Sequence, residues 1–229
     1  MDCNIHPLES VKLYSGPLSM FGAKVEIAAR EKGINFEREW VAFSQKQGYN
    51  PKHPEVLRIN PTAQVPVWVD SAVELYDSTQ IFEYFEDRWP TPPLWPSALD
   101  ERARARLLEH ASDEVFFPYV VKLMGLRANP DPVDSPEWRQ TRSRIEAYYV
   151  KMEQTLDGGP FLAGEYTYAD IAFYMAQFFA ARHTVPMSDT LTKLRAWRSR
   201  VARRAAVNQV INSMATYLRS IDYAVPDFS

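Results

Sequence analysis

Residues 60–70, NPTAQVPVWVD, and residues 74–78, ELYDS, decide the fold of this chain. Pro66 stands at the first position of an apolar, β-branched strand, where its missing N–H is not needed for pairing. X–Pro bonds at such corners are the commonest cis peptides, so we expect Val65–Pro66 to be cis. A cis bond would turn the N–H and carbonyl of Val65 outward, where they could pair with another extended peptide.

The second part of this stretch predicts a place for a carboxylate. Asp77 and Ser78 follow a short strand and open a helix. Free N–H groups and the dipole at a helix start favour a negatively charged ligand. A strand edge beside such a cradle suits a small γ-linked peptide, and glutathione is the obvious candidate.

The composition excludes several classes of function. The chain has 229 residues, 46% hydrophobic and 24% charged, which is ordinary for a globular protein. A net charge of −3 gives no electrostatic case for nucleic acid or an anionic membrane. The single cysteine, Cys3, cannot form an internal disulfide, and neither an export signal nor a membrane span is recognisable. We therefore expect a reduced, cytoplasmic protein. His110 and His183 lack partners at ligand spacing, so no metal is expected.

The first third of the chain alternates strands and helices. The expected elements are a strand at 11–14, a helix at 21–32 closed by Gly33, a strand at 36–41, a short helix at 54–59, strands after Pro66 and at 74–76, and a helix at 78–89. This βαβ-α-ββα order predicts an α+β, thioredoxin-like domain over residues 11–89 with a mixed four-stranded sheet.

After a proline-rich linker at residues 90–99 the sequence pattern changes from alternating strands and helices to helices alone. Strand signals vanish, and an all-α domain is expected over residues 100–218, followed by a tail at 219–229. The expected helices are 100–127, 135–156, one opened by Thr167 and Asp170 in a capping box, 190–203 and 205–218. The arginines between 195 and 204 are expected on a solvated face.

Four motifs in order resemble the soluble glutathione transferases over nearly the whole chain. They are residues 13–33 (first strand, loop and helix), residues 60–66 (NPTAQVP), residues 77–85 beginning with Asp-Ser, and residues 161–172 (FLAGEYTYADIA). The resemblance is to bacterial-type, serine-dependent members of theta-, tau- or zeta-like classes. It implies a glutathione transferase fold, glutathione as co-substrate and a homodimer.

The resemblance also implies a glutathione site. Val65, beside Pro66, would pair its main chain with the cysteinyl part, while Asp77 and Ser78 would hold the γ-glutamyl ammonium and carboxylate. Many relatives have glutamate where this chain has Asp77, which shortens the reach by one carbon.

Lys52 and Gln64 sit where relatives contact the glycyl carboxylate. A histidine that is common just before that lysine in one plant class is Pro51 here. The glycyl end would therefore be held more loosely.

Ser19, just before the first helix, is the expected catalytic hydroxyl. A free thiol has a pKa of about 8.5, and lowering it by about two units requires roughly 2.7 kcal/mol. A hydrogen bond to the anion contributes about 1.5–3 kcal/mol, and a helix N-terminus adds about 0.3–1 kcal/mol. Tyr14 and Ser15 are rival hydroxyls, and Ser19 as a plain N-cap is the structural alternative. Thiol-exchange classes have cysteine at this position, so conjugation, thiolytic displacement or isomerisation is favoured.

An apolar, methionine-containing wall is expected for the second substrate. Its candidate residues are Met20, Phe21, Phe116, Phe117, Tyr119, Val120, Leu123 and Met124. The alternative is that this aromatic stripe is core.

Two functions remain open from the sequence. One is a cytoplasmic, dimeric detoxification-type transferase that attacks an apolar electrophile. The other is a non-catalytic adaptor with the same fold, which binds a protein partner through the tail at residues 223–229.

Overall fold

The computed structural model describes residues 11–44, 46–126 and 135–227. The expectations for Cys3 and for the leader at residues 1–10 lie outside these ranges. By its internal contacts the chain divides into two compact units, Met1–Pro92 and Pro93–Ser229.

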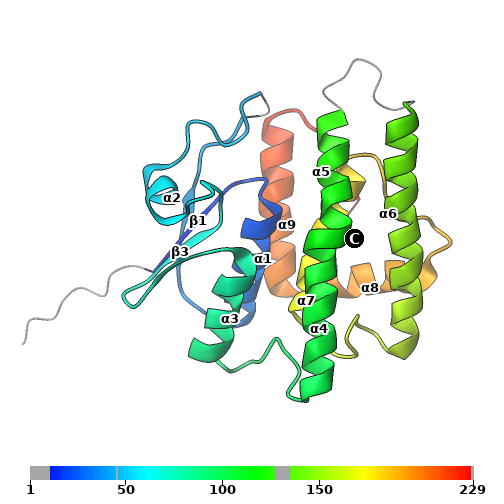
Figure 1. Ribbon diagram of the computed structural model, residues 1–229, viewed down its shortest axis with the longest axis horizontal. Coiled ribbons are helices and arrows are strands. Elements are labelled where there is room, and N and C mark those ends of the chain that lie inside the picture. Colours follow the sequence, from blue (N-terminus) through cyan, green and yellow to red (C-terminus); the bar gives the residue numbers. More distant parts are fainter. Residues whose placement is uncertain (1–10, 45, 127–134, 228–229) are drawn as a thin grey trace, which may run out of the picture. The chain divides into compact units, whose positions relative to one another are not determined.

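The first unit is built on a mixed sheet with the strand order β2-β1-β3-β4 (Figure 1). Its elements are β1 (Lys12–Ser15), α1 (Met20–Glu31), β2 (Glu37–Trp40), α2 (Pro54–Ile59), β3 (Val67–Val69), β4 (Glu74–Tyr76) and α3 (Ser78–Arg88). β1 pairs parallel with β2 and antiparallel with β3, and β3 pairs antiparallel with β4. The predicted βαβ-α-ββα order and mixed sheet are confirmed.

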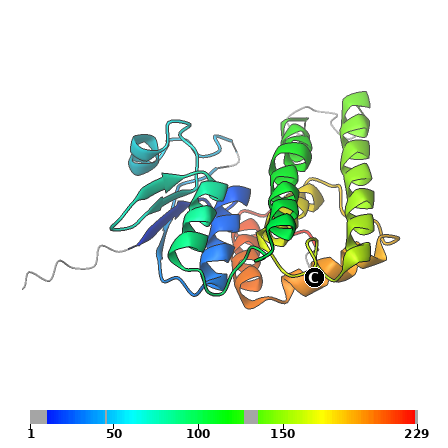
Figure 2. The ribbon, with the colours of Figure 1, turned by 60° about the horizontal axis from the view of Figure 1, so that its bottom comes forward.

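Helices α1 and α3 lie side by side on one face of the sheet, and α2 lies on the other (Figure 2). On the α1–α3 face, Trp68 of β3 meets Phe85 of α3 edge-on with ring centroids 4.6 Å apart. Gly33 ends α1 with a φ of +67°, a conformation that glycine adopts without strain. The predicted C′ glycine is confirmed.

The second unit is helical. Its elements are α4 (Leu99–Ala111), a π-helical turn η1 (Ser112–Phe116), α5 (Phe117–Leu126), α6 (Pro136–Thr155), the 3-10 turn η3 (Leu156–Gly158), α7 (Tyr168–Arg182), α8 (Thr192–Ala202) and α9 (Ala205–Ser220). In the described part of the chain, no helix is both long and apolar enough to span a bilayer.

The prediction of one unbroken helix from Asp100 is wrong, because the π-helical turn separates α4 from α5. Pro118 explains the break. It has no N–H to give to the carbonyl four residues earlier, and its ring crowds that carbonyl. A wider turn just before the proline accommodates both effects. Ser112 adds a bond from its hydroxyl to the Leu108 carbonyl at 3.0 Å.

The predicted helix starts at Ser135 and Thr167 are confirmed. Ser135 Oγ accepts the Trp138 N–H at 3.1 Å. Asp170 accepts the N–H of Thr167 at 2.9 Å and the indole N–H of Trp197 at 2.7 Å, which ties α7 to α8. The solvated-face prediction for the arginine run is wrong at Arg198, which is 4% exposed.

Candidate functional site

The start of α1 carries the serine that the sequence singles out. Ser19 is the N-cap, and its Oγ accepts the Gly22 N–H at 2.9 Å. The Ser19 N–H donates to the Gly16 carbonyl at 3.1 Å, which fixes the turn into the helix. The N-cap role is thus observed, and it uses the hydroxyl only as an acceptor. Its hydrogen is given to no other residue of the described chain, so Ser19 keeps a donor for a ligand.

Gly22 brings a second hydroxyl to the same place. Ser15, at the end of β1, is 1% exposed. A Cβ on Gly22 would overlap its Oγ and would stand 3.1 Å from the Oγ of Ser19. The absent side chain of Gly22 is therefore what lets both hydroxyls lie against the first turn of α1.

Tyr14, the other rival, points to the opposite face of the sheet, as strand alternation requires. It packs in a buried cluster with Val41, Val56 and Val67 beneath α2. Its ring centroid lies 5.0 Å from that of His53. Burial raises the pKa of its phenol. The structure therefore places Tyr14 in the packing under α2, away from the hydroxyls of Ser15 and Ser19.

Tyr49 covers the loop between β1 and α1. Its hydroxyl oxygen accepts the N–H of Leu18, one residue before Ser19, at 3.3 Å. A Cβ on Gly16 would overlap the Tyr49 ring. Only glycine at position 16 allows this approach, and Tyr49 in turn braces the loop that holds Ser19.

The predicted corner before β3 is observed. The Val65–Pro66 bond is cis, and strand pairing begins only at Val67. Asn60 holds the preceding turn, because its side-chain amide donates to the Gln64 carbonyl at 2.7 Å and its oxygen accepts the Thr62 N–H at 2.9 Å. In residues 11–227 as described, no main-chain partner is found for Val65. A peptide edge is thus left open at this corner.

Asp77 and Ser78 open a helix as predicted. Asp77 is the N-cap of α3 with a φ of +73°, and its Oδ1 accepts the N–H groups of Thr79 and Gln80 at 3.0 and 3.1 Å. The Asp77 side chain is exposed, and Ser78 is buried. The shorter acid is therefore a helix cap as well as a candidate ligand, with one carboxylate oxygen committed to the helix.

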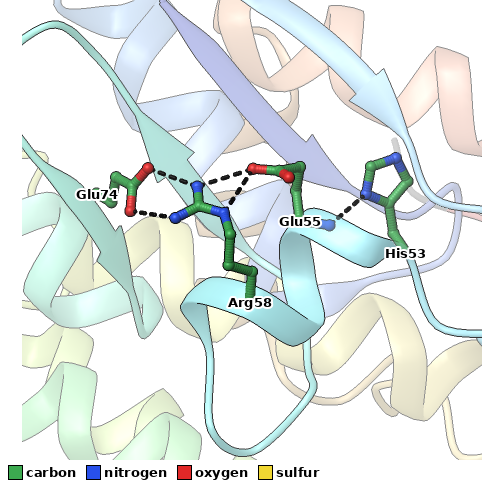
Figure 3. A network of polar contacts seen from close by, with 4 residues as sticks. All are labelled: His53, Glu55, Arg58 and Glu74. Atoms are coloured by element: carbon green, nitrogen blue, oxygen red, sulfur yellow. Dashed lines mark hydrogen bonds and ion pairs between the residues drawn. The ribbon is translucent and has the colours of Figure 1, made fainter.

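An arginine fastens α2 to the sheet (Figure 3). Arg58 on α2 donates to Glu55 at 2.8 Å and to Glu74 of β4 at 2.5 and 2.8 Å. The hydrogen bonds from Arg58 lower the pKa of the Glu74 carboxyl. His53 begins α2, with its Nδ1 accepting the Glu55 N–H at 3.2 Å, which leaves the proton on Nε2. The half-buried Lys52 stands directly before this helix. Lys52 and His53 are thus positioned at the start of α2.

The other predicted ligands are less tightly defined. Gln64 is exposed, and its main-chain carbonyl accepts the hydrogen bond from Asn60. The residues predicted to contact the second substrate are divided between the two units. Met20 and Phe21 belong to the first, and Phe116, Phe117, Tyr119, Val120, Leu123 and Met124 to the second.

Phe116 is a correction to this prediction. It is completely buried, with its ring centroid 5.0 Å from that of Tyr148 and 5.3 Å from that of Phe173. It is therefore part of the aromatic core of the helical unit. Met20, Phe117, Val120 and Leu123 are also buried, whereas Tyr119 is half-buried.

Sequence reasoning missed His53, Arg58, Tyr49 and the tight glycines Gly16 and Gly22. The Glu55–Arg58 spacing of three residues on a helix was a visible signal. The contacts of Tyr49 and Glu74 join segments that are far apart in the chain, and no sequence signal marked them. Among the described residues no cluster of three or more metal-ligating side chains is found.

Comparisons with known proteins agree with this fold. A family model described as the N-terminal domain of glutathione S-transferase matches residues 18–88, and one described as its C-terminal domain matches residues 132–214. The chain is 30% identical to a stringent starvation protein A homolog of Coxiella burnetii, over 69% of this chain and 70% of that protein. It is 28% identical to a zeta-class glutathione S-transferase of Euphorbia esula, over 75% and 76%.

The fold agrees with solved transferases. A glutathione S-transferase from the Antarctic clam Laternula elliptica superimposes with a TM-score of 0.77 at 25% identity, covering 88% of this chain and 92% of that one. A thioredoxin-like unit followed by a helical unit defines this class. The chain belongs to the glutathione S-transferase family.

Proposed function

We propose that this protein is a serine-type glutathione transferase that activates the thiol of glutathione for attack on an apolar electrophile. The observation that carries the proposal is the Ser19 hydroxyl, which accepts from the Gly22 N–H and retains its own hydrogen at the N-terminus of α1. Family membership supports glutathione as the co-substrate.

The energetics of the first step fit this geometry. A hydroxyl that donates to an anion contributes about 1.5–3 kcal/mol, and the helix start adds about 0.3–1 kcal/mol. Their sum meets the roughly 2.7 kcal/mol needed to lower a thiol pKa by two units. The Gly22–Ser19 bond also polarises the hydroxyl, because an oxygen that accepts a hydrogen bond becomes a better donor. The hydroxyl of Ser15 lies against the same turn of α1.

The remainder of the first unit supplies the groups that would hold the tripeptide. The open main chain of Val65 would pair with the cysteinyl residue. Ser78 and the second carboxylate oxygen of Asp77 would hold the γ-glutamyl end, and Lys52, His53 and Gln64 would face the glycyl carboxylate. We assign the electrophile to an apolar surface at the start of α1 that includes Phe21, and leave the buried Met20 and Phe116 out of it. The active form is proposed to be a cytoplasmic homodimer.

The direct test is retention on glutathione resin together with conjugation of glutathione to a chloro-nitroaromatic compound. Ser19→Ala should bind the resin but lose most turnover, because it removes the donor to the thiolate. Ser15→Ala is the matched control, a serine against the same helix turn, and should keep most activity. Equal turnover in wild type and Ser19→Ala would overturn the assignment.

A second candidate function is a non-catalytic adaptor for a protein partner. Two observations favour it: Asp77 commits one carboxylate oxygen to capping α3, and the relatives include stringent starvation protein A homologs as well as transferases. An adaptor would show neither retention on glutathione resin nor turnover, in the wild type as in both variants.

A further inference from the structure

A cavity of about 870 Å³ lies in the helical unit, and none of its lining residues is among those assigned above to glutathione. It is formed by α6, the end of α7, the segment from α7 to α8, α8 itself, and the extended chain after α9. Its charged lining residues are Arg142, Glu146, Asp189, Arg195, Arg198 and Asp227.

Arg198 is the unusual member of this set. Its side chain is 5% exposed, although arginine is rarely buried without a compensating anion. Its neighbour on α8, Trp197, is bonded to the buried Asp170, so the register of α8 is fixed. The helix thus presents a guanidinium to the cavity in a set position.

The chain after α9 reaches this guanidinium with one residue. Arg198 Nη2 donates to Asp227 Oδ2 at 3.1 Å, and Arg198 Nη1 lies 3.5 Å from the Asp227 carbonyl oxygen. Arg198 thus contacts both the main-chain carbonyl and the carboxylate of Asp227. That pair of acceptors is characteristic of an acidic residue within a peptide.

Two other arginines that line the cavity have carboxylate partners of their own. Arg195 forms an ion pair with Asp189, and Arg142 pairs with Glu146 at 2.7 Å. Both acids lie near their arginines in the sequence, whereas Asp227 is 29 residues away from Arg198. Withdrawal of Asp227 would leave three arginines and two carboxylates lining the cavity.

We propose that this cavity is a binding site for an extended acidic peptide, with Pro226 and Asp227 of the tail as its resident occupant. An acidic segment of a partner protein would exchange with the tail at Arg198. The Asp227 side chain is 68% exposed, and ion pairs so open to water stabilise little, so the resident can be displaced. As a tethered competitor, at an effective concentration on the order of millimolar, it would hold the site closed to weak ligands.

The test uses a fluorescent peptide with the sequence of residues 223–227, Tyr-Ala-Val-Pro-Asp, blocked at its carboxyl end, and measures fluorescence anisotropy with the full chain. Asp227→Asn removes the resident carboxylate and should bind the peptide at least tenfold more tightly than wild type. Asp222→Asn, which changes an acid of the same tail outside the cavity lining, should bind like wild type.

Three outcomes would overturn the proposal. They are equal affinity of wild type and Asp227→Asn, undiminished binding of a peptide with asparagine in place of aspartate, and competition by free succinate at the peptide's own concentration. Arg198→Gln should abolish binding, but the buried position could compromise folding, so the decision rests on the exposed Asp227. The proposal does not rest on the transferase assignment, and the result of this test leaves that assignment unaffected.

Discussion

The hydroxyl of Ser15 occupies the space that a side chain on Gly22 would need. This relationship joins the end of β1 to the first turn of α1, where Ser19 caps the helix. The geometry of the proposed thiol site therefore depends on a residue with no side chain.

Gly22→Ala should disturb this junction. Alanine usually stabilises a helix relative to glycine by about 0.5–1 kcal/mol, but here the added methyl meets Ser15 and should cost about 1–3 kcal/mol. Conjugation should fall together with stability. Gly125→Ala in α5 is the control, because nothing lies within 4 Å of its added Cβ. Denaturant unfolding of both variants gives the comparison, and equal effects would contradict this description of the junction.

Tyr49→Phe should loosen the loop that carries Ser19. The substitution keeps the ring over Gly16 and removes the acceptor for the Leu18 N–H, a loss of about 0.5–1.5 kcal/mol. KM for glutathione should rise while the fold is retained. Tyr49→Leu, which also removes the ring, should raise it further. Steady-state kinetics with varied glutathione measure both, and a KM unchanged in both variants would argue against a bracing role.

Arg58→Gln should release α2 from β4. Because the ion pairs of Arg58 are exposed, we expect little change in unfolding but a higher KM for glutathione through the displaced Lys52 and His53. Added salt should raise the wild-type KM in the same direction, since exposed pairs are screened. Arg104→Gln, which removes an exposed pair with Asp100 in the helical unit, serves as the control. A variant with wild-type KM at every salt concentration would exclude this role for α2.

Asp170 should make stability depend on pH. Its burial outweighs the hydrogen bonds from Leu162, Trp197 and Thr167 and raises its pKa from 3.8 to about 6. Between these values the folded state binds more protons than the unfolded state, so stability should fall as pH rises from about 4 to 6. The change amounts to at most about 3 kcal/mol.

Asp170→Asn should lose this component, although it is less stable overall because Asn cannot accept as many N–H groups. Denaturant unfolding of wild type and variant across this pH range isolates the effect of Asp170, since all other titrating groups are shared. Parallel stability curves would show that the carboxyl titrates with its ordinary pKa.

Local chemistry made much of the fold predictable. Pro66 before a β-branched run, Gly33 after a helix and Ser135 before a proline each act within a few residues, and all three predictions are confirmed. The π-helical turn was missed because the helical spacing of apolar residues continues through it, although Pro118 was visible.

The candidate site was less predictable than the fold, because only part of it depends on residues that are neighbours in the sequence. Ser19, Asp77 and Ser78 belong to helix starts, which the sequence marks. The contacts of Tyr49 with Leu18 and of Arg58 with Glu74 join segments that are far apart in the chain. The burial of Arg198 depends on the packing of α8, which charge patterning alone does not reveal.

The most direct test of the central claim is a titration of the thiol of bound glutathione by ultraviolet absorbance of the thiolate. Wild type should show a pKa well below the free value of about 8.5. Ser19→Asp is the decisive variant, because aspartate caps a helix as well as serine but offers only an acceptor. The pKa of the thiol bound to this variant should be higher than in wild type by at least about one to two units. The free energy of unfolding should change little. A thiol pKa equal in wild type and Ser19→Asp would contradict the account.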